Sequence, residues 1–295
     1  MTTASNPSQH SRGVLKHLWG GAKRLLGLHR PGRNFPVFPD DVFLVSYPKS
    51  GNTWTRFLVA NLLHPDRQVD FGNINQLTPD PEALTQRELA RLPRPRIIKS
   101  HQYFDPRYRR VIYIVRDPRD VVLSAYHFDV KRQLIDDQFS IEKYVADFVQ
   151  SDLSHPQWQH PYGSWHENVA SWFYVRRHHP EFLLVRYEAL QSDGMGELAR
   201  IAEFLGLSAD PQRLARALDR SSSDRMRQLE KQQAHLWSST RQTRKDKPFV
   251  RTATAGGWRA ELPEICVAEI ESAWGCLMKE LGYELAVSSP ELRAK

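Results

Sequence analysis

The sequence predicts an α/β protein with three layers (α/β/α), in which helices cover both faces of a central, mostly parallel sheet. From Asp41 onward, short apolar runs alternate with helical stretches, and this β-α-β-α order is typical of that architecture. The apolar runs are continuous, which favours parallel strands buried on both faces. With 295 residues and 40% hydrophobic content, the chain can bury a sizeable core. The expected strands are 42–47, 96–99, 111–115 and 182–186.

Helical periodicity marks the stretches between and after these strands. Helices are expected at 53–63, 82–91, 118–128, 140–150, 165–178, 195–205, 211–219 and 263–281. We expect one domain over residues 41–285, an N-terminal tail at 1–40 and a C-terminal tail at 286–295. Residues 238–257 are polar and basic with little periodicity, and so long a loop in a compact domain is usually functional or disordered.

Within the N-terminal tail, residues 13–29 form a basic amphipathic segment, GVLKHLWGGAKRLLGLH. Its apolar residues gather near one helical face, and its lysines and arginine lie off that face. Two interpretations stay open: a helix packed on the globular body, or a helix that contacts an anionic membrane surface peripherally. The pair Gly20-Gly21 interrupts the helix in either case.

Composition limits the classes of function. The net charge of +7 favours anionic partners. No apolar run reaches the roughly 18–20 residues of a membrane span, and the N-terminus lacks a signal-peptide pattern. Cys266 and Cys276 would face different sides of one helix, so no disulfide is expected, and no Cys/His zinc spacing occurs. We therefore expect a cytoplasmic protein without a metal.

The first candidate ligand site is SYPKSGNTW, which follows the first strand. Pro48 ends the strand, and Gly51 permits close backbone approach or a positive φ. The backbone N–H groups of residues 50–53 then open a helix, and a helix N-terminus binds phosphate. Lys49 adds a mobile positive charge. A surface turn with an exposed lysine is the alternative.

Side chains of the same loop add donors and an aromatic ring that could stack on a purine. These residues are Ser50, Asn52, Thr53 and Trp54. The pattern differs from the triphosphate loop G-x-x-x-x-G-K-[ST], because Lys49 precedes Gly51 and no first glycine is present.

The second candidate site is VIYIVRDPRDVVLSAYHF, which has the same logic. Arg116 stands at the carboxyl end of a strand, where ligands bind in open α/β sheets. Asp117 is a good N-cap, and Ser124 lies about two turns into the helix on the same face as Asp120. Arginine and serine converging there suit a second phosphate. The alternative is an Arg–Asp pair that caps the helix, with Ser124 a small packing residue.

With both motifs in place, the chain resembles sulfotransferases that use 3′-phosphoadenosine 5′-phosphosulfate as donor. YPKSGNTW resembles that family's 5′-phosphosulfate loop, and YIVRDPRDVVLSAYHF resembles its 3′-phosphate motif. The likeness runs from about Asp41 to about Tyr283. It implies a P-loop-like nucleotide fold, this nucleotide as co-substrate, and transfer of a sulfuryl group to a hydroxyl or amine acceptor.

The resemblance also implies roles for individual residues. Lys49 would contact the bridging oxygen and the sulfuryl group, and His101, in a K-[TS]-H pattern, would be the catalytic base. The 5′ phosphate would bind to Ser50, Gly51, Asn52 and Thr53. Trp54 and Tyr187 would lie against adenine, and Arg116 and Ser124 would hold the 3′ phosphate.

A third family motif, R-K-G-x-x-G-x-W-K, is only partly matched, by RTATAGGWR. Arg251 keeps its place, whereas Thr252 and Ala253 replace the expected lysine and glycine. These three residues are expected to contact the 3′ phosphate. Relatives often have Thr-Ser-Phe where this chain has Ser-Ser-Ser, and Ser221 could still donate to the adenine ring.

Two other classes of function are the alternatives. A nucleotide-dependent phosphotransferase would need a metal-binding carboxylate, and Asp117 and Asp120 are better explained as helix caps. A nucleic-acid-binding protein is not expected, because RGG and RNP-type signals are absent.

The acceptor class stays open between small molecules and carbohydrate-bearing or lipid hydroxyl compounds, and the sequence predicts no oligomeric state. Trp158, Tyr162, Trp165, His166 and Trp172 crowd one region and could form an aromatic acceptor wall, although a helix core is the better explanation for Trp172.

Overall fold

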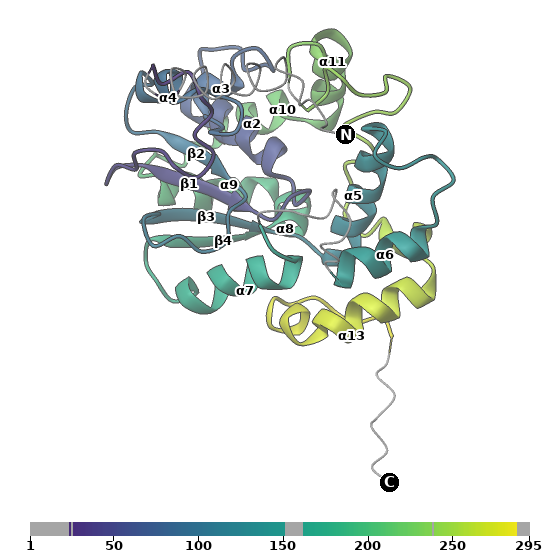
Figure 1. The fold of residues 1–295 in the computed structure, drawn as a ribbon. Coiled ribbons are helices and arrows are strands. Elements are labelled where there is room, and N and C mark those ends of the chain that lie inside the picture. The colour runs from purple at the N-terminus through teal and green to yellow at the C-terminus, as the bar shows by residue number, and fades with distance from the viewer. Residues whose placement is uncertain (1–23, 25, 151–161, 238, 288–295) are drawn as a thin grey trace, which may run out of the picture.

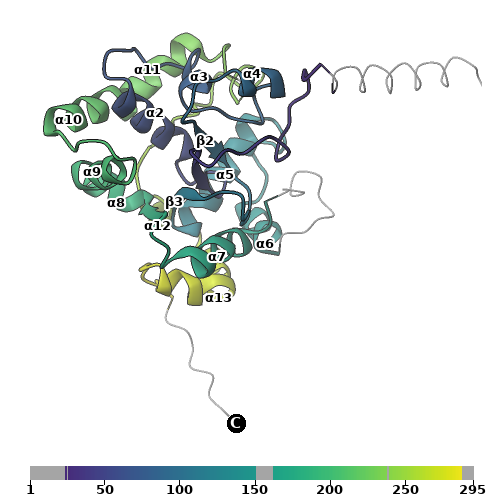
Figure 2. The ribbon, with the colours of Figure 1, turned by 90° about the vertical axis from the view of Figure 1, so that its left-hand side faces the viewer.

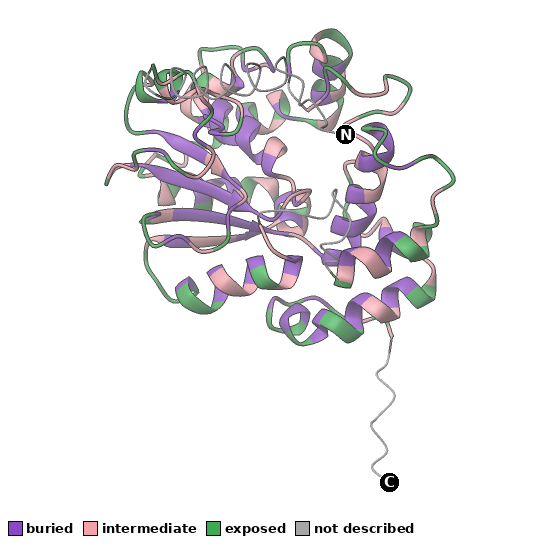
Figure 3. Cartoon of the chain, viewed as in Figure 1, coloured by how far each residue is buried: buried purple, intermediate pink, exposed green. Residues whose placement is uncertain are grey.

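The computed structural model describes residues 24, 26–150, 162–237 and 239–287, and it confirms the predicted α/β class. Its sheet has four parallel strands in the order β2-β1-β3-β4. They are β1 (Val42–Ser46), β2 (Ile97–Ser100), β3 (Arg110–Val115) and β4 (Phe182–Arg186), close to the predicted ranges. All four lie at the centre of the molecule in Figure 1, and Figure 3 shows them as largely buried.

Most predicted helices are present, with ends shifted by a few residues. They are α2 (Asn52–Leu63), α4 (Gln86–Ala90), α5 (Pro118–Lys131), α6 (Ile141–Gln150), α7 (Trp165–Arg176), α9 (Gly194–Phe204), α10 (Pro211–Arg220) and α13 (Glu264–Glu280). Local signals fix several starts. Thr85 and Glu88 form a capping box, so α4 begins later than predicted. Asp117 caps α5 ahead of Pro118.

Four short or polar helices were not predicted. They are α3 (Ile74–Leu77), α8 (Tyr187–Ser192), α11 (Ser223–Gln233) and α12 (Trp258–Glu261). Helix α8 begins at the residue that follows β4, so Tyr187 stands at both a strand end and a helix start.

Alternate side chains of each strand pack into two separate cores. Phe43 and Tyr113 face a core built with α5, α6, α7 and α13. Leu44 and Ile112 face the opposite core, with α2, α9 and α10. Figure 2 shows these two helix sets on opposite sides of the sheet. The strands are thus buried on both faces, as their continuous apolar runs predicted.

Residues 239–257 contain no helix or strand, as predicted from the weak periodicity of residues 238–257. Buried side chains satisfy their backbone groups instead. Lys131 donates from Nζ to the carbonyls of Arg244 (2.9 Å) and Lys247 (2.5 Å). The carboxylate of Glu230 accepts the N–H groups of Phe249 (2.6 Å) and Val250 (3.0 Å). We call residues 239–257 the strap, because it runs across the carboxyl edge of the sheet.

Some predictions fall outside the described residues. The amphipathic segment at 13–29 and the proposed wall residue Trp158 are mostly or wholly among them. Within the described ranges, no helix is both long and apolar enough to cross a bilayer. Both cysteines lie on α13 as free thiols, Cys266 buried and Cys276 exposed.

Candidate active site

One large cavity, of about 590 Å³, lies at the carboxyl edge of the sheet. The chain that follows each strand contributes a residue to the lining of this cavity. Lys49 follows β1 within three residues, whereas His101, Arg116 and Tyr187 directly follow β2, β3 and β4. This is the edge at which open α/β sheets bind ligands. The parallel order of the strands therefore brings together four residues that lie far apart in the sequence.

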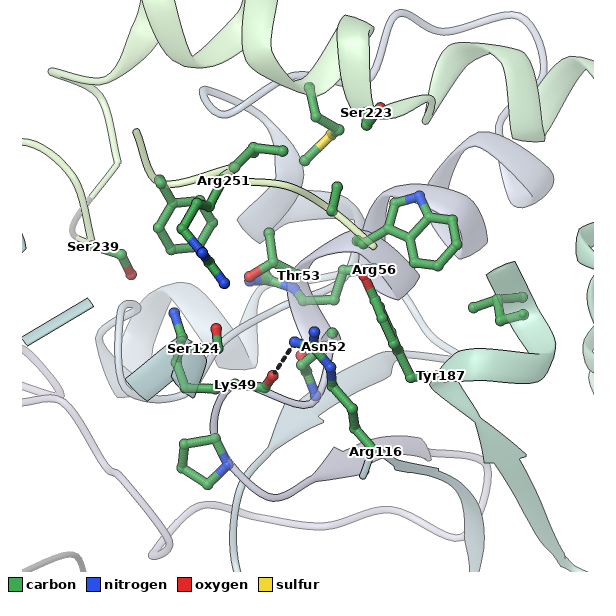
Figure 4. A pocket seen from close by; sticks show the side chains of 18 of the residues that line it. Lys49, Asn52, Thr53, Arg56, Arg116, Ser124, Tyr187, Ser223, Ser239 and Arg251 are labelled. Carbon is green, nitrogen blue, oxygen red and sulfur yellow. Dashed lines mark hydrogen bonds between the residues drawn. The ribbon is translucent and has the colours of Figure 1, made fainter. Parts of the chain in front are cut away.

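Almost all of the predicted site residues line this cavity (Figure 4). Those that do are Lys49, Gly51, Asn52, Thr53, Trp54, His101, Arg116, Ser124, Tyr187, Arg251, Thr252 and Ala253. Ser50 and Ser221 do not.

The backbone of the first loop takes the shape that a helix-start anion site needs. Lys49 and Gly51 both have positive φ values, 68° and 92°. An added Cβ at Gly51 would lie 2.5 Å from Cδ2 of Tyr187, so only glycine fits there. Helix α2 starts at the next residue, and its first N–H groups lack partners within the helix.

The amide of Asn52 does not face the cavity as a donor, which differs from the sequence interpretation. Asn52 turns its amide back toward β1 and donates from Nδ2 to the carbonyl of Leu44 and to Oγ of Ser46, both at 3.2 Å. Ser50 is fully buried, and its N–H donates to the carbonyl of Tyr47 at 3.3 Å. Asn52 therefore offers the cavity its backbone rather than its amide.

Lys49 lies in an unusual environment for an ammonium group. Its Nζ is 3.8 Å from the ring centroid of Phe128 and 5.0 Å from that of Phe249 in the strap. Burial lowers the pKa of Lys49 to about 7. The negative charge of Asp129 opposes this shift, and Arg116 reinforces it. A lysine in this state gains its full charge when an anion binds beside it.

Arg116 joins the first loop to the strap. Its Nη1 donates to the carbonyl of Lys49, and its Nη2 to the carbonyl of Thr254, both at 3.2 Å. Its guanidinium lies 4.4 Å from the ring centroid of Tyr187. Nε of Arg116, which lines the cavity, is buried and has no hydrogen-bond partner among the described residues. Unpaired buried donors are costly, and an anionic ligand would satisfy donors of this kind.

Two aromatic rings form one wall of the cavity. Trp54 meets Tyr187 edge to face, with ring centroids 5.6 Å apart. The indole Nε1 of Trp54 donates to the carbonyl of Ser221 at 2.9 Å. The hydroxyl of Ser221 accepts a hydrogen bond from the amide of Asn61 (3.1 Å) and is fully buried. Ser221 therefore positions Trp54 and does not itself face the cavity.

The strap supplies the third predicted motif. Ala253 has a φ of 54°, in the left-handed region that glycine adopts more freely than alanine. Gln191 donates to the carbonyl of Ala253 and holds the strap at that point. Nη1 of Arg251 donates to both carboxylate oxygens of Glu261, at 2.6 and 2.8 Å. The side chain of Glu261 also contacts Nε2 of His127 at 3.0 Å.

His101 is oriented by the end of β1. Its Nδ1 lies 2.7 Å from the carbonyl oxygen of Ser46. Because a carbonyl can only accept, Nδ1 carries the proton and Nε2 keeps its lone pair. Burial and the nearby charge of Lys99 lower the pKa of His101 to about 3, so the imidazole is neutral at pH 7. A neutral imidazole with a free Nε2 can accept a proton from a hydroxyl group.

Three charged residues that were not predicted as site residues also line the cavity: Arg56, Asp80 and Lys99. Lys99 stands two residues before His101, and this spacing along a strand places both side chains on one face. Its position in the K-S-H pattern could have revealed it. Arg56 and Asp80 come from a helix interior and a loop and carry no local sequence signal.

Most of the aromatic residues considered for an acceptor wall do not line the cavity. Trp172 is fully buried in the core, as the sequence favoured, and Trp165 is buried there as well, while His166 does not line the cavity. Tyr162 lies closer, with its ring centroid 5.7 Å from that of His101. Within the described part of the chain, no cluster of three or more His, Cys, Asp or Glu could hold a metal ion.

Comparison with known sequences identifies a family. The family model described as Sulfotransferase domain matches residues 39–282. Sulfotransferase 2A6 from Rattus norvegicus is 30% identical over 236 residues, which cover 76% of this chain and 80% of the relative. Sulfotransferase 1B1 from Mus musculus is 28% identical over 241 residues, 76% of this chain and 78% of the relative.

Solved structures share the fold. Mouse sulfotransferase SULT7A1 complexed with PAP has a TM-score of 0.66 at 22% identity, covering 84% of this chain and 88% of that one. Retinol dehydratase in complex with androsterone and the inactive cofactor PAP has a TM-score of 0.66 at 21% identity, covering 88% and 85%.

Proposed function

Because the chain belongs to the sulfotransferase family, we propose that this enzyme moves a sulfuryl group from 3′-phosphoadenosine 5′-phosphosulfate to a hydroxyl or amine group of an acceptor. One observation carries the proposal. The four strand ends bring two cations, a neutral histidine and a tyrosine to a single cavity, which is large enough for a nucleotide. PAP, the desulfated form of this donor, occupies two structures of the same fold.

The residues present suit the two charged ends of this nucleotide. The N–H groups at the start of α2 would take the 5′ phosphate, with Lys49 beside it. Arg116, Ser124 and the strap, through Arg251, would take the 3′ phosphate. Trp54 and Tyr187 would lie against adenine.

The donor supplies an activated sulfur atom, and the protein supplies position and charge. His101 Nε2 would accept the proton of the acceptor hydroxyl as the acceptor oxygen forms its bond to sulfur. The bond from sulfur to the bridging oxygen breaks, and the electron pair stays on the departing phosphate. Lys49 and the loop N–H groups would stabilise that charge. Lys99, next to His101, would add a second ammonium near the transferred group.

We propose small hydroxyl compounds as acceptors and a cytoplasmic location, which suits two free thiols. The test is transfer of label from ³⁵S-donor to a panel of phenols, steroids, alcohols and sugars, with Lys49→Met as the matched control. Transfer that disappears in the variant supports the proposal. Transfer from ATP–Mg²⁺ in place of the sulfated donor, with loss on chelation, would indicate a phosphotransferase instead.

A further inference from the structure

A buried ion pair stands beside the proposed base. Nζ of Lys99 lies 2.8 Å from Oδ2 of Asp80, and the two side chains are only 14% and 9% exposed. Oδ1 of Asp80 accepts the N–H of Glu82 at 3.0 Å, which fixes the carboxylate within its own loop. The N–H of Lys99 donates to the carbonyl of Pro79 at 2.8 Å. The loop is therefore tied to β2 through both backbone and side chain.

This pair occupies the wall next to His101. Asp80, Lys99 and His101 line the large cavity and also a small neighbouring cavity on the other side of that wall. Arg56 lies close by and is itself held by Thr78 (3.1 Å) and Asn75 (2.7 Å). Against the opposing effect of burial, the charges of Lys99 and Arg56 lower the pKa of Asp80, so its carboxylate keeps its negative charge.

We propose that Asp80 is a positioning residue for sulfuryl transfer, which holds the ammonium of Lys99 beside His101 and away from the nucleotide phosphates. A lysine side chain has a flexible four-carbon stem, and an unpaired ammonium in a cavity rich in bound phosphate turns toward that phosphate. The carboxylate of Asp80 prevents this movement and keeps the ammonium of Lys99 beside His101, where the acceptor would bind. Asp80 acts through Lys99 and does not touch the reacting atoms.

This proposal rests on the proposed function. It predicts that loss of the Asp80 charge lowers turnover but does not weaken nucleotide binding. Asp80→Asn keeps the shape of the side chain and removes its charge. We expect kcat to fall about 10- to 100-fold, as for other misplaced groups in active sites. The Kd for adenosine 3′,5′-bisphosphate should stay within about 3-fold of wild type, or become tighter as Lys99 is released. If Asp80 had a purely structural role, the substitution would lower kcat and weaken nucleotide binding together.

A double-mutant cycle tests whether Asp80 acts through Lys99. On a Lys99→Met background, Asp80→Asn should change kcat by less than about 3-fold, because the group that it positions is gone. Full additivity of the two losses would overturn the proposal, as would unchanged kcat in Asp80→Asn alone.

Asp41→Asn is the matched control. It breaks a different buried ion pair, between Asp41 and Arg96 at 2.6 Å, whose residues do not line the cavity. It should lower the melting temperature without changing kcat.

The contact between Asp80 and Lys99 can also be tested without measuring activity. In ¹⁵N-lysine NMR spectra, the hydrogen-bonded ammonium of Lys99 should give a protected Nζ signal in the wild-type protein, identified by its loss in Lys99→Met. That signal should broaden or vanish in Asp80→Asn. A signal that is the same in both proteins would show that Asp80 does not hold Lys99, whatever the reaction proves to be.

Discussion

The affinity of this protein for adenosine 3′,5′-bisphosphate should fall as the pH rises from 7 to 9, because free Lys49 loses its proton over that range. Burial against Phe128 and Phe249 lowers the pKa of Lys49 to about 7. A bound phosphate stabilises the ammonium and returns its pKa toward the ordinary value of about 10.4. The nucleotide therefore binds the protonated form of the protein more tightly, and binding takes up a proton.

The size of the effect follows from the fraction of protonated Lys49. With a pKa of about 7, half of the free protein carries the ammonium at pH 7 and about 1% at pH 9. If only the protonated form binds well, Kd rises about 50-fold between these two pH values. Titration of the nucleotide phosphates contributes little to this change, because their second pKa, about 6, lies below the pH range of 7 to 9.

Isothermal titration calorimetry in buffers of different ionisation enthalpy measures both quantities. We expect uptake of about 0.5 proton per nucleotide at pH 7 and close to one at pH 8.5. Lys49→Met should bind more weakly and lose the pH dependence. A Kd in the wild-type protein that is flat from pH 7 to 9, or the same slope in Lys49→Met, would refute the assignment of this proton to Lys49.

Further predictions concern three other residues of the site. His101→Ala should lower kcat by about 10²–10⁴, the usual range for a lost general base, while nucleotide binding is retained. Because burial holds the pKa of His101 near 3, its ring should stay neutral, and its NMR signals should not titrate between pH 5 and 8. Gly51→Ala should abolish nucleotide binding in calorimetry, because the new Cβ would collide with the ring of Tyr187. Glu261→Gln should tighten nucleotide binding several-fold, because it frees Arg251 from a competing carboxylate.

A control or a contrary result accompanies each of these substitutions. Gly32 also has a positive φ but no atom within 4 Å of an added Cβ, so Gly32→Ala tests strain alone, about 1 kcal/mol, and should leave nucleotide binding intact. Near-normal turnover in His101→Ala, or an NMR midpoint near pH 6.5, would remove His101 as the neutral base. Weaker nucleotide binding in Glu261→Gln would show that Glu261 orients Arg251 for the ligand instead of competing with it.

The sheet and the two phosphate motifs could be predicted because their signals are local. A buried parallel strand is a continuous apolar run, and each motif needs only a strand end followed directly by a helix start. The parallel order of the strands then places Lys49 and Arg116 at the same edge. Their contact through the Lys49 carbonyl follows from that order.

Features that depend on contacts between distant segments could not be predicted in this way. Helix α11 buries mainly Met226 and Leu229 against residues near Phe71, so it has little apolar periodicity of its own. Asp80 is an ordinary loop aspartate until the fold places it beside Lys99, nineteen positions away. The turned amide of Asn52 was equally hidden, because its partners belong to β1.

The most direct test of the central claim is a crystal structure of the protein with adenosine 3′,5′-bisphosphate. The account predicts one nucleotide in one cavity, with the 5′ phosphate at the start of α2 beside Lys49 and the 3′ phosphate on Arg116 and Ser124. His101 Nε2 should then face the open side of the 5′ phosphate. A nucleotide that contacts only one of the two cations, or lies outside this cavity, would contradict the account.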